Sequence, residues 1–223
     1  MHPPALLVMT KPALPGRVKT RLAATLGPGA AARLHAAFFE DLVERLSAEP
    51  WELRTYWALE PGEALPARGF RQRGADLGAR LFHAFSEQAG RPFAAAIGSD
   101  HPELDGGTVR AAFAALEAGA DVALGPARDG GYYLVALRPD EVRRELFEGI
   151  DWSTDRVFAQ TLANCARLGL AVARLEVGED VDTPADLERL AARLAARPGS
   201  CRRTEELLAE LGFLRRPEVA CAS

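Results

Sequence analysis

Six short apolar runs alternate along this chain with longer stretches of helical pattern. The runs are continuous rather than alternately apolar and polar, which is typical of strands covered on both faces. They occupy residues 5–9, 53–59, 93–97, 121–124, 132–137 and 171–177. Apolar positions three and four apart predict helices over residues 30–46, 77–88, 108–118, 154–168 and 184–194. This order predicts an α/β fold, a three-layer sandwich with a mostly parallel central sheet and right-handed crossovers.

The helical pattern breaks at Arg197-Pro198-Gly199-Ser200. Proline and glycine are typical of a linker, so we expect residues 1–197 to form one domain and residues 198–223 to form a C-terminal helical tail. A short amphipathic helix is expected over residues 201–213. The tail could pack on the body of the protein or on a second subunit, which leaves a homodimer as one alternative.

Composition narrows the class of function. The 223 residues carry a net charge of −4, which does not favour nucleic-acid binding, because that requires a basic face. No apolar run approaches the roughly 18 residues that span a bilayer, and residues 1–9 lack the basic start of a signal peptide. Cys165, Cys201 and Cys221 are odd in number and widely spaced, which favours reduced thiols. A cytoplasmic protein that acts on small molecules is expected.

Ligands of open α/β sheets bind beyond the carboxyl ends of the strands, and the first predicted strand is followed by a basic loop, residues 11–21. Two prolines and a glycine prevent regular structure there, and a helix is expected to begin near its end. Cations beside a helix N-terminus suit phosphate binding, although the Walker A spacing is absent. A solvated basic turn is the alternative. The polar residues of the loop are Lys11, Arg17, Lys19, Thr20 and Arg21.

Placement of the lysines favours the phosphate-binding interpretation of the basic loop. Lys11 and Lys19 are the only lysines in the chain, and every other basic residue is arginine. Lysine and arginine are not interchangeable where geometry matters. Both lysines therefore indicate a site rather than a solvated turn.

Two acidic positions could hold a metal ion. Asp100 follows the 93–97 strand in the turn Gly98-Ser99-Asp100-His101-Pro102, where a capping or turn role is the alternative. Asp182 precedes Thr183, Pro184 and Asp186, which have the capping-box pattern of a helix start, so these neighbours of Asp182 are expected to be structural. Magnesium binds one or two protein carboxylates together with phosphate oxygens and water, and Asp100 and Asp182 could supply that pair. His101 is expected to be a packed residue.

Two further loops are candidates for the cleft. Glycines flank an aspartate at the helix entrance of residues 72–80, where the backbone could approach a base or ribose; a capped helix start is the alternative. The residues concerned are Gln72, Gly74, Asp76 and Gly78.

The second loop, residues 125–133, contains Arg128-Asp129-Gly130-Gly131, a pattern that also predicts a hairpin. The hairpin does not explain Arg128 and Asp129. Asp129 could bind an acceptor hydroxyl or act as a base, and Arg128 could hold an anion. Trp152-Ser153-Thr154-Asp155 adds an aromatic and polar cluster before a helix.

Taken together, these motifs resemble the rSAM/selenodomain-associated transferase group of the GT-A superfamily, which contains glycosyltransferases and nucleotidyltransferases. The match extends over residues 5–187 and leaves the tail beyond Arg197 unmatched. The matching segments are residues 11–22, Asp76-Leu77-Gly78, Gly98-Ser99-Asp100, residues 125–133 and Val181-Asp182-Thr183-Pro184.

The resemblance implies a GT-A, Rossmann-like fold, a nucleotide-bearing donor and a divalent metal, Mg²⁺ or Mn²⁺. The Val181–Pro184 segment is similar to that of CMP-sugar synthetases, which implies metal ligation by Asp100 and Asp182. The basic loop is similar to the phosphate-binding signature of nucleotidyltransferases, including phospholactate guanylyltransferase, which implies phosphate binding by Arg17, Lys19 and Arg21. The glycine-rich opening of sugar-nucleotide pyrophosphorylases is absent.

Two chemistries fit these features. Nucleotidyl transfer from a nucleoside triphosphate to a phosphorylated small molecule is favoured, because four cations in one loop suit a triphosphate and the Asp100 turn lacks the Asp-x-Asp pair of many glycosyltransferases. Its catalytic residues would include Arg17 and Lys19. Glycosyl transfer from a nucleotide sugar to a small-molecule acceptor is the alternative, with Asp129 as the base. A non-catalytic nucleotide-binding regulator is disfavoured, because it would not need cations and acids in one cleft.

Overall fold

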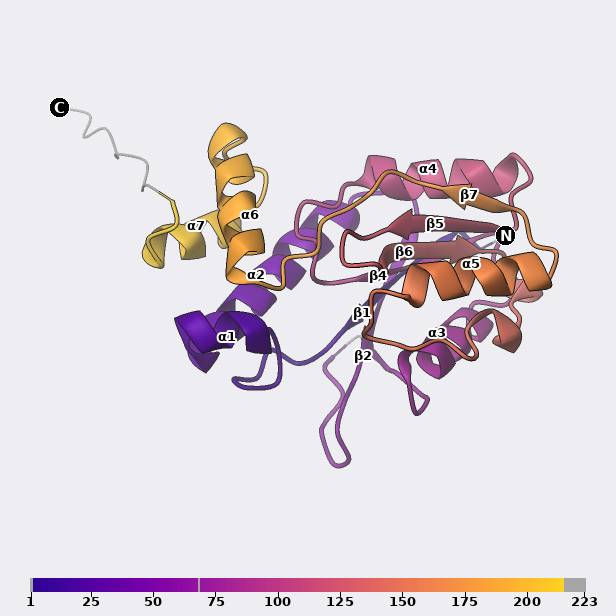
Figure 1. Cartoon of the computed structure of the whole chain (residues 1–223), viewed down its shortest axis with the longest axis horizontal. Coiled ribbons are helices and arrows are strands. Elements are labelled where there is room, and N and C mark those ends of the chain that lie inside the picture. The colour runs from indigo at the N-terminus through magenta and orange to yellow at the C-terminus, as the bar shows by residue number, and fades with distance from the viewer. Residues whose placement is uncertain (1, 68, 215–223) are drawn as a thin grey trace.

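The computed structural model describes residues 2–67 and 69–214, which form the expected α/β fold (Figure 1). Seven strands form one sheet in the order β3-β2-β1-β4-β6-β5-β7. Six were predicted, and the additional strand, β3, has only three residues. The strands are β1 (Ala5–Thr10), β2 (Glu52–Trp57), β3 (Gly69–Arg71), β4 (Ala94–Gly98), β5 (Val122–Pro126), β6 (Tyr132–Leu137) and β7 (Val172–Arg174).

The sheet is mostly parallel, as predicted, with one exception. β1 pairs in parallel with β2 and β4 on its two sides, whereas β6 runs antiparallel to both β4 and β5. The β5–β6 pair is the hairpin expected at Asp129-Gly130-Gly131. Because β6 is reversed, its first residue lies at the same edge as the last residues of β1 and β4. Side chains from all three strands therefore reach one edge of the sheet.

Helices cover both faces of the sheet and form the outer layers of the sandwich. Along β1, Leu6 and Val8 pack with α4 and the end of α2, while Ala5 and Leu7 pack with α3. This alternation is the period of two that a strand imposes. Figure 1 shows α4 on one face and α3 with α5 on the other. The helices are α1 (Thr20–Leu26), α2 (Pro28–Leu46), α3 (Leu77–Ser86), α4 (Gly106–Glu117), α5 (Val157–Arg167), α6 (Pro184–Ala196) and α7 (Arg202–Glu210), with 3₁₀ turns η1 (Pro139–Glu141) and η2 (Arg144–Leu146).

The helix expected to begin near the end of the basic loop is α1, which starts at Thr20 and is separate from α2. Gly27 divides it from α2 with a φ of 82°, a left-handed value that glycine adopts easily, and Pro28 starts α2. No helix in the described part of the chain is long and apolar enough to cross a membrane.

The tail helix α7 packs on the body of the protein. Its buried Leu207 and Leu208 join α1, α2 and α6 in a third apolar cluster beyond the end of the sheet. The buried carboxylate of Asp41 in α2 accepts hydrogen bonds from the backbone N–H groups of Arg203 (3.1 Å) and Thr204 (2.8 Å). A carboxylate there satisfies the free N–H groups of the first turn and favours the helix dipole. Residues 215–223 of the expected tail lie outside the described residues.

Docking of α7 predicts a large loss of stability in Leu208→Ala. The Leu208 side chain is fully buried, so truncation should lower the free energy of unfolding by about 2–5 kcal/mol. Leu65→Ala is the matched control, because Leu65 is 46% exposed and should change stability by less than about 0.5 kcal/mol. Urea unfolding followed by circular dichroism measures both. Equal midpoints for Leu208→Ala and wild type would show that α7 does not dock.

Candidate active site

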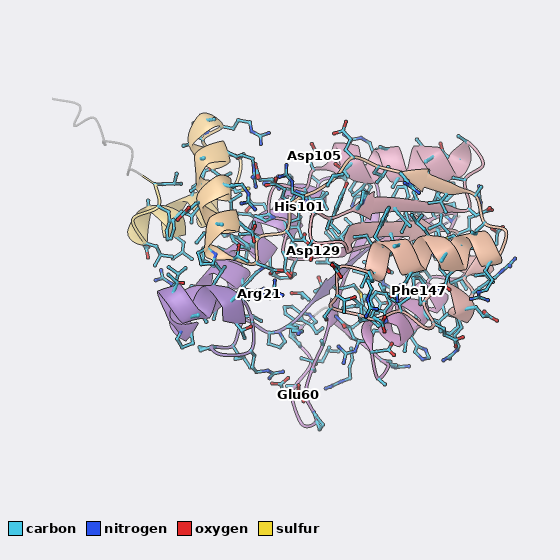
Figure 2. The ribbon with its side chains drawn as sticks, in the orientation of Figure 1. Arg21, Glu60, His101, Asp105, Asp129 and Phe147 are labelled. Atoms are coloured by element: carbon cyan, nitrogen blue, oxygen red, sulfur yellow. The ribbon has the colours of Figure 1, made fainter. Side chains whose placement is uncertain are left out.

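A cleft of about 960 Å³ opens at the carboxyl-terminal edge of the sheet, where β1 and β4 end and β6 begins. This is the edge at which ligands of α/β folds bind. The basic loop forms one wall, and residues 129–135 and 152–157 form the opposite wall. In Figure 2, Arg21 of α1 and Asp129 of the β5–β6 turn lie at this opening. Its lining comes from most, but not all, of the residues in the segments 9–11, 17–21, 72–81, 96–100, 129–135 and 152–157, with His35 and Asp182.

The two predicted acids face each other across a lysine. The Lys19 ammonium lies 2.6 Å from Oδ1 of Asp100 and 3.0 Å from Oδ1 of Asp182, and it donates to the backbone oxygen of Val181 at 2.6 Å. The contacts with Val181 and Asp182 are hydrogen bonds, and the contact with Asp100 is an ion pair. Although burial alone would lower the pKa of Lys19, the two carboxylates raise it above its ordinary value. The sequence placed the acids and Lys19 in one cleft without predicting that they pair.

The backbone of Lys19 is also unusual. Its φ of 48° and ψ of 44° lie in the left-handed region, at the residue that precedes α1. Residues other than glycine adopt this conformation uncommonly, and it persists where surrounding contacts hold it. Lys19 has such contacts at both its side chain and its backbone, because its ammonium group is buried against the two acids and its carbonyl oxygen accepts from the Ala23 N–H at 2.8 Å.

A buried polar network fixes Asp100 from the other side. The Nδ1 atom of His35, in α2, lies 3.6 Å from Oδ1 of Asp100, and its Nε2 atom lies 3.1 Å from the Lys11 carbonyl oxygen. Burial opposes ionisation of Asp100, but Lys19 and His35 hold its pKa well below the usual range. Oδ1 of Asp100 is buried while 40% of the side chain is exposed, so Oδ2 faces the cleft.

Sequence reasoning gave no role to His35, because its position fits the apolar face of α2. It also left Asp180 without a role. Burial, followed by the neighbouring carboxylate of Asp100, raises the pKa of Asp180 to about 7. His101 is packed, as expected: its ring contacts Tyr133 edge to face at 5.2 Å, and burial lowers its pKa to about 4.

The four cations of the basic loop are not equivalent. Arg17 pairs with Glu60 at 3.4 Å and with Glu63, both in the loop that projects between β2 and β3 (Figure 2). Lys19 pairs with Asp100 and Asp182. Lys11 and Arg21 are exposed in the cleft, and neither has a carboxylate within ion-pair distance among residues 2–67 and 69–214. Only these two loop cations are free to meet a ligand without breaking an ion pair.

Other predicted site residues line the cleft while serving the fold. Gln72 donates to the backbone oxygens of Thr10 (3.1 Å) and Tyr56 (2.8 Å), and Asp76 caps α3 by accepting from the backbone of Ala79. The buried Ser99 hydroxyl is 2.9 Å from that of Thr10. Thr20, the first residue of α1, and Gly131 also line the cleft.

Four predicted residues do not line the cleft. Arg128 points elsewhere and pairs with Glu179 at 2.7 Å. Packing accounts for the three glycines: Gly74 lies against Ala79, Gly78 against the backbone oxygen of Phe147, and Gly130 against the backbone of Asp155. A side chain at Gly78 or Gly130 would collide with those neighbours. In this structure Arg128, Gly74, Gly78 and Gly130 therefore lie outside the lining of the cleft.

The wall opposite the basic loop is aromatic, hydroxylated and acidic. The lining residues between 129 and 157, a fully described segment, include no lysine or arginine. Asp129 is exposed there, with Oδ1 accepting from the Gly131 N–H at 3.0 Å. The rings of Tyr132 and Trp152 pack edge to face at 6.3 Å. Ser153 has a left-handed φ of 66°. The cleft thus has a cationic wall at the basic loop and an uncharged-to-acidic wall at residues 129–157, and Arg80 of α3 is a further lining cation.

A family model described as "Uncharacterized protein conserved in bacteria (DUF2064)" matches residues 33–154. The chain belongs to this family. Its similarity extends to the crystal structure of a candidate nucleotide-diphospho-sugar transferase from Desulfovibrio desulfuricans G20, with 32% identity and a TM-score of 0.86. The match covers 95% of this chain and 96% of that one. This similarity confirms the expectation that this DUF2064 chain is a transferase.

More distant structures share only the fold with this DUF2064 chain. A CMP-2-keto-3-deoxy-manno-octonic acid synthetase complexed with CTP has a TM-score of 0.53 at 14% identity, covering 86% of this chain and 98% of that one. A cytidylyltransferase from Leptospira borgpetersenii has a TM-score of 0.54 at 11% identity, covering 98% and 99%. A search of curated proteins found no match.

Proposed function

We propose that this chain is a metal-dependent transferase that uses a nucleotide-activated donor. The position of the cleft, its cationic wall and the similarity to a candidate nucleotide-diphospho-sugar transferase support this assignment. In this proposal the donor phosphates lie along the basic loop, where Lys11 and Arg21 are free to bind them. The association with rSAM and selenodomain proteins stays a prediction from the motifs.

The acid pair suits a divalent cation. Asp100 and Asp182 present hard oxygen ligands on one point of the cleft wall, and Oδ2 of Asp100 is open to the cleft. No group of three or more metal-ligating side chains occurs in the described residues. A Mg²⁺ or Mn²⁺ ion held by this pair would complete its shell with phosphate oxygens and water. Such an ion would neutralise charge on the departing phosphate.

The wall opposite the basic loop favours glycosyl transfer to a hydroxyl acceptor. A phosphorylated acceptor would need cations beside it, and residues 129–157 place none in the cleft. Instead they present an exposed carboxylate, Asp129, suited to remove a proton from a hydroxyl. This observation reverses the preference drawn from the sequence, which rested on four cations suited to a triphosphate. Two of those four, Arg17 and Lys19, are paired with acids of the chain.

Nucleotidyl transfer is the second candidate. One observation favours it: Arg80 also lines the cleft, so a triphosphate that displaced the carboxylates from Arg17 and Lys19 would meet five cations. A non-catalytic regulator is disfavoured, because it would not need cations and acids in one cleft.

The products decide between these functions. The protein is incubated with Mn²⁺, a panel of neutral sugars and polyols, and either nucleotide sugars or nucleoside triphosphates. We expect a nucleoside diphosphate to be released from one nucleotide sugar, in amounts equal to the glycosylated acceptor. Pyrophosphate released from a triphosphate would establish nucleotidyl transfer instead. Binding without either product, followed as a ligand-dependent rise in the melting temperature, would support the regulator.

A further inference from the structure

The lysine between the two acids occupies the place that a metal ion would take. Its ammonium is in contact distance of both carboxylates, and only 2% of the Lys19 side chain is exposed. A divalent ion bound to the same oxygens would lie against this ammonium, and two cations in contact repel strongly where water is excluded. On these same oxygens, Asp100 and Asp182 can therefore hold Lys19 or a metal ion, but not both in this arrangement.

Lys19 is the partner that can leave. His35, on the other side of Asp100, is fixed by the Lys11 carbonyl oxygen and by Thr10, whose Oγ1 lies 3.3 Å from Nε2 of His35. Lys19 instead carries its charge on a flexible four-carbon chain and lines the cleft from the start of α1. Its backbone is also left-handed, a conformation that costs free energy unless surrounding contacts hold it.

We propose that Lys19 and the divalent metal exchange at Asp100 and Asp182, and that the released lysine binds the donor phosphate that arrives with the metal. This inference rests on the proposed function. Its consequence is that binding of the metal and binding of the nucleotide are coupled. Metal alone must displace the Lys19 ammonium into a cleft that holds no anion. Metal bound together with a nucleotide supplies a phosphate that pairs with the displaced ammonium. Each ligand then strengthens binding of the other by the same factor.

Direct measurement of Mn²⁺ binding tests the exchange without an activity assay. Isothermal titration and Mn²⁺ electron paramagnetic resonance give the affinity of the full chain with and without UDP, or GDP, CDP, ADP or dTDP where UDP does not bind. In wild type, the nucleotide should raise Mn²⁺ affinity about 10-fold or more, within the 5- to 150-fold range usual for coupled sites. Nucleotide binding without any change in Mn²⁺ affinity would overturn the proposal.

Lys19→Gln supplies the second measurement. Glutamine can still donate to the Val181 oxygen but carries no charge, so Mn²⁺ alone should bind about 10-fold tighter than to wild type, and the nucleotide should add less. Arg21→Met is the matched control: Arg21 is a cleft cation without an acid partner, so Mn²⁺ alone should bind as it does to wild type. Unchanged or weaker Mn²⁺ affinity in folded Lys19→Gln contradicts the exchange.

The two measurements separate this proposal from the proposed function. If no nucleotide binds, the transferase assignment fails, and the comparison of Lys19→Gln with wild type on Mn²⁺ alone still decides the exchange. If Lys19→Gln does not fold, as judged by circular dichroism, Lys19→Met, which also removes the charge, is measured in the same way. If nucleotides bind and turn over but neither effect appears, the exchange fails while the function stands.

Discussion

Asp100→Asn is expected to lower turnover on the cognate donor by about 10²–10³-fold, the cost of removing one preorganised electrostatic group at a reacting centre. Asparagine keeps the shape of the side chain and can still accept from Lys19, so the fold should survive. The negative charge is lost, however, at the point where the carboxylates of Asp100 and Asp182 converge. Steady-state rates measured over a Mn²⁺ titration should show both the lower turnover and a higher metal requirement.

Asp105→Asn is the matched control for that result. Asp105 lies with Asp100 in the connection between β4 and α4 (Figure 2). It caps α4 by accepting from the Thr108 N–H at 2.9 Å, and it does not line the cleft. Asparagine is as good a cap as aspartate, so its turnover should remain close to wild type. An Asp100→Asn enzyme that kept more than a tenth of wild-type turnover would remove Asp100 from the metal site.

The sequence predicted the parts of the site that follow from strand order. Asp100 comes directly after a buried strand, and Asp129 lies in a turn between two others, so an α/β sheet brings both to the same edge. The antiparallel course of β6 was not readable from its residues alone. A central strand is apolar on both faces whichever way it runs, and only the short Asp-Gly-Gly turn before it indicated a reversal.

The partners of the cations could not be predicted, because they are distant in sequence. Lys19 and Asp182 are 163 residues apart, and Arg17 and Glu63 are 46 apart. No local pattern encodes such a pair; only the packed fold does. The same holds for His35, whose polar role is hidden in a helix position that is otherwise apolar. Counting the cations of the basic loop from the sequence therefore overestimates the positive charge that is free to bind a ligand.

Asp129→Asn is expected to lower turnover by about 10²–10⁴-fold, the usual contribution of a general base, while the KM for the donor changes little. The substitution keeps the local structure, because the asparagine side-chain oxygen can still accept from the Gly131 N–H. Only the capacity to take a proton from the acceptor is lost. Initial rates at saturating donor, with acceptor concentration varied, measure the effect.

Asp155→Asn is the control on the same wall. Asp155 is also an exposed carboxylate that lines the cleft, so both variants remove one negative charge from similar surroundings. A loss confined to Asp129→Asn assigns the base, whereas a loss confined to Asp155→Asn would transfer the role to Asp155. If neither variant loses turnover, no base acts on this wall. That result would favour nucleotidyl transfer, because an acceptor phosphate is already ionised and needs no base to attack.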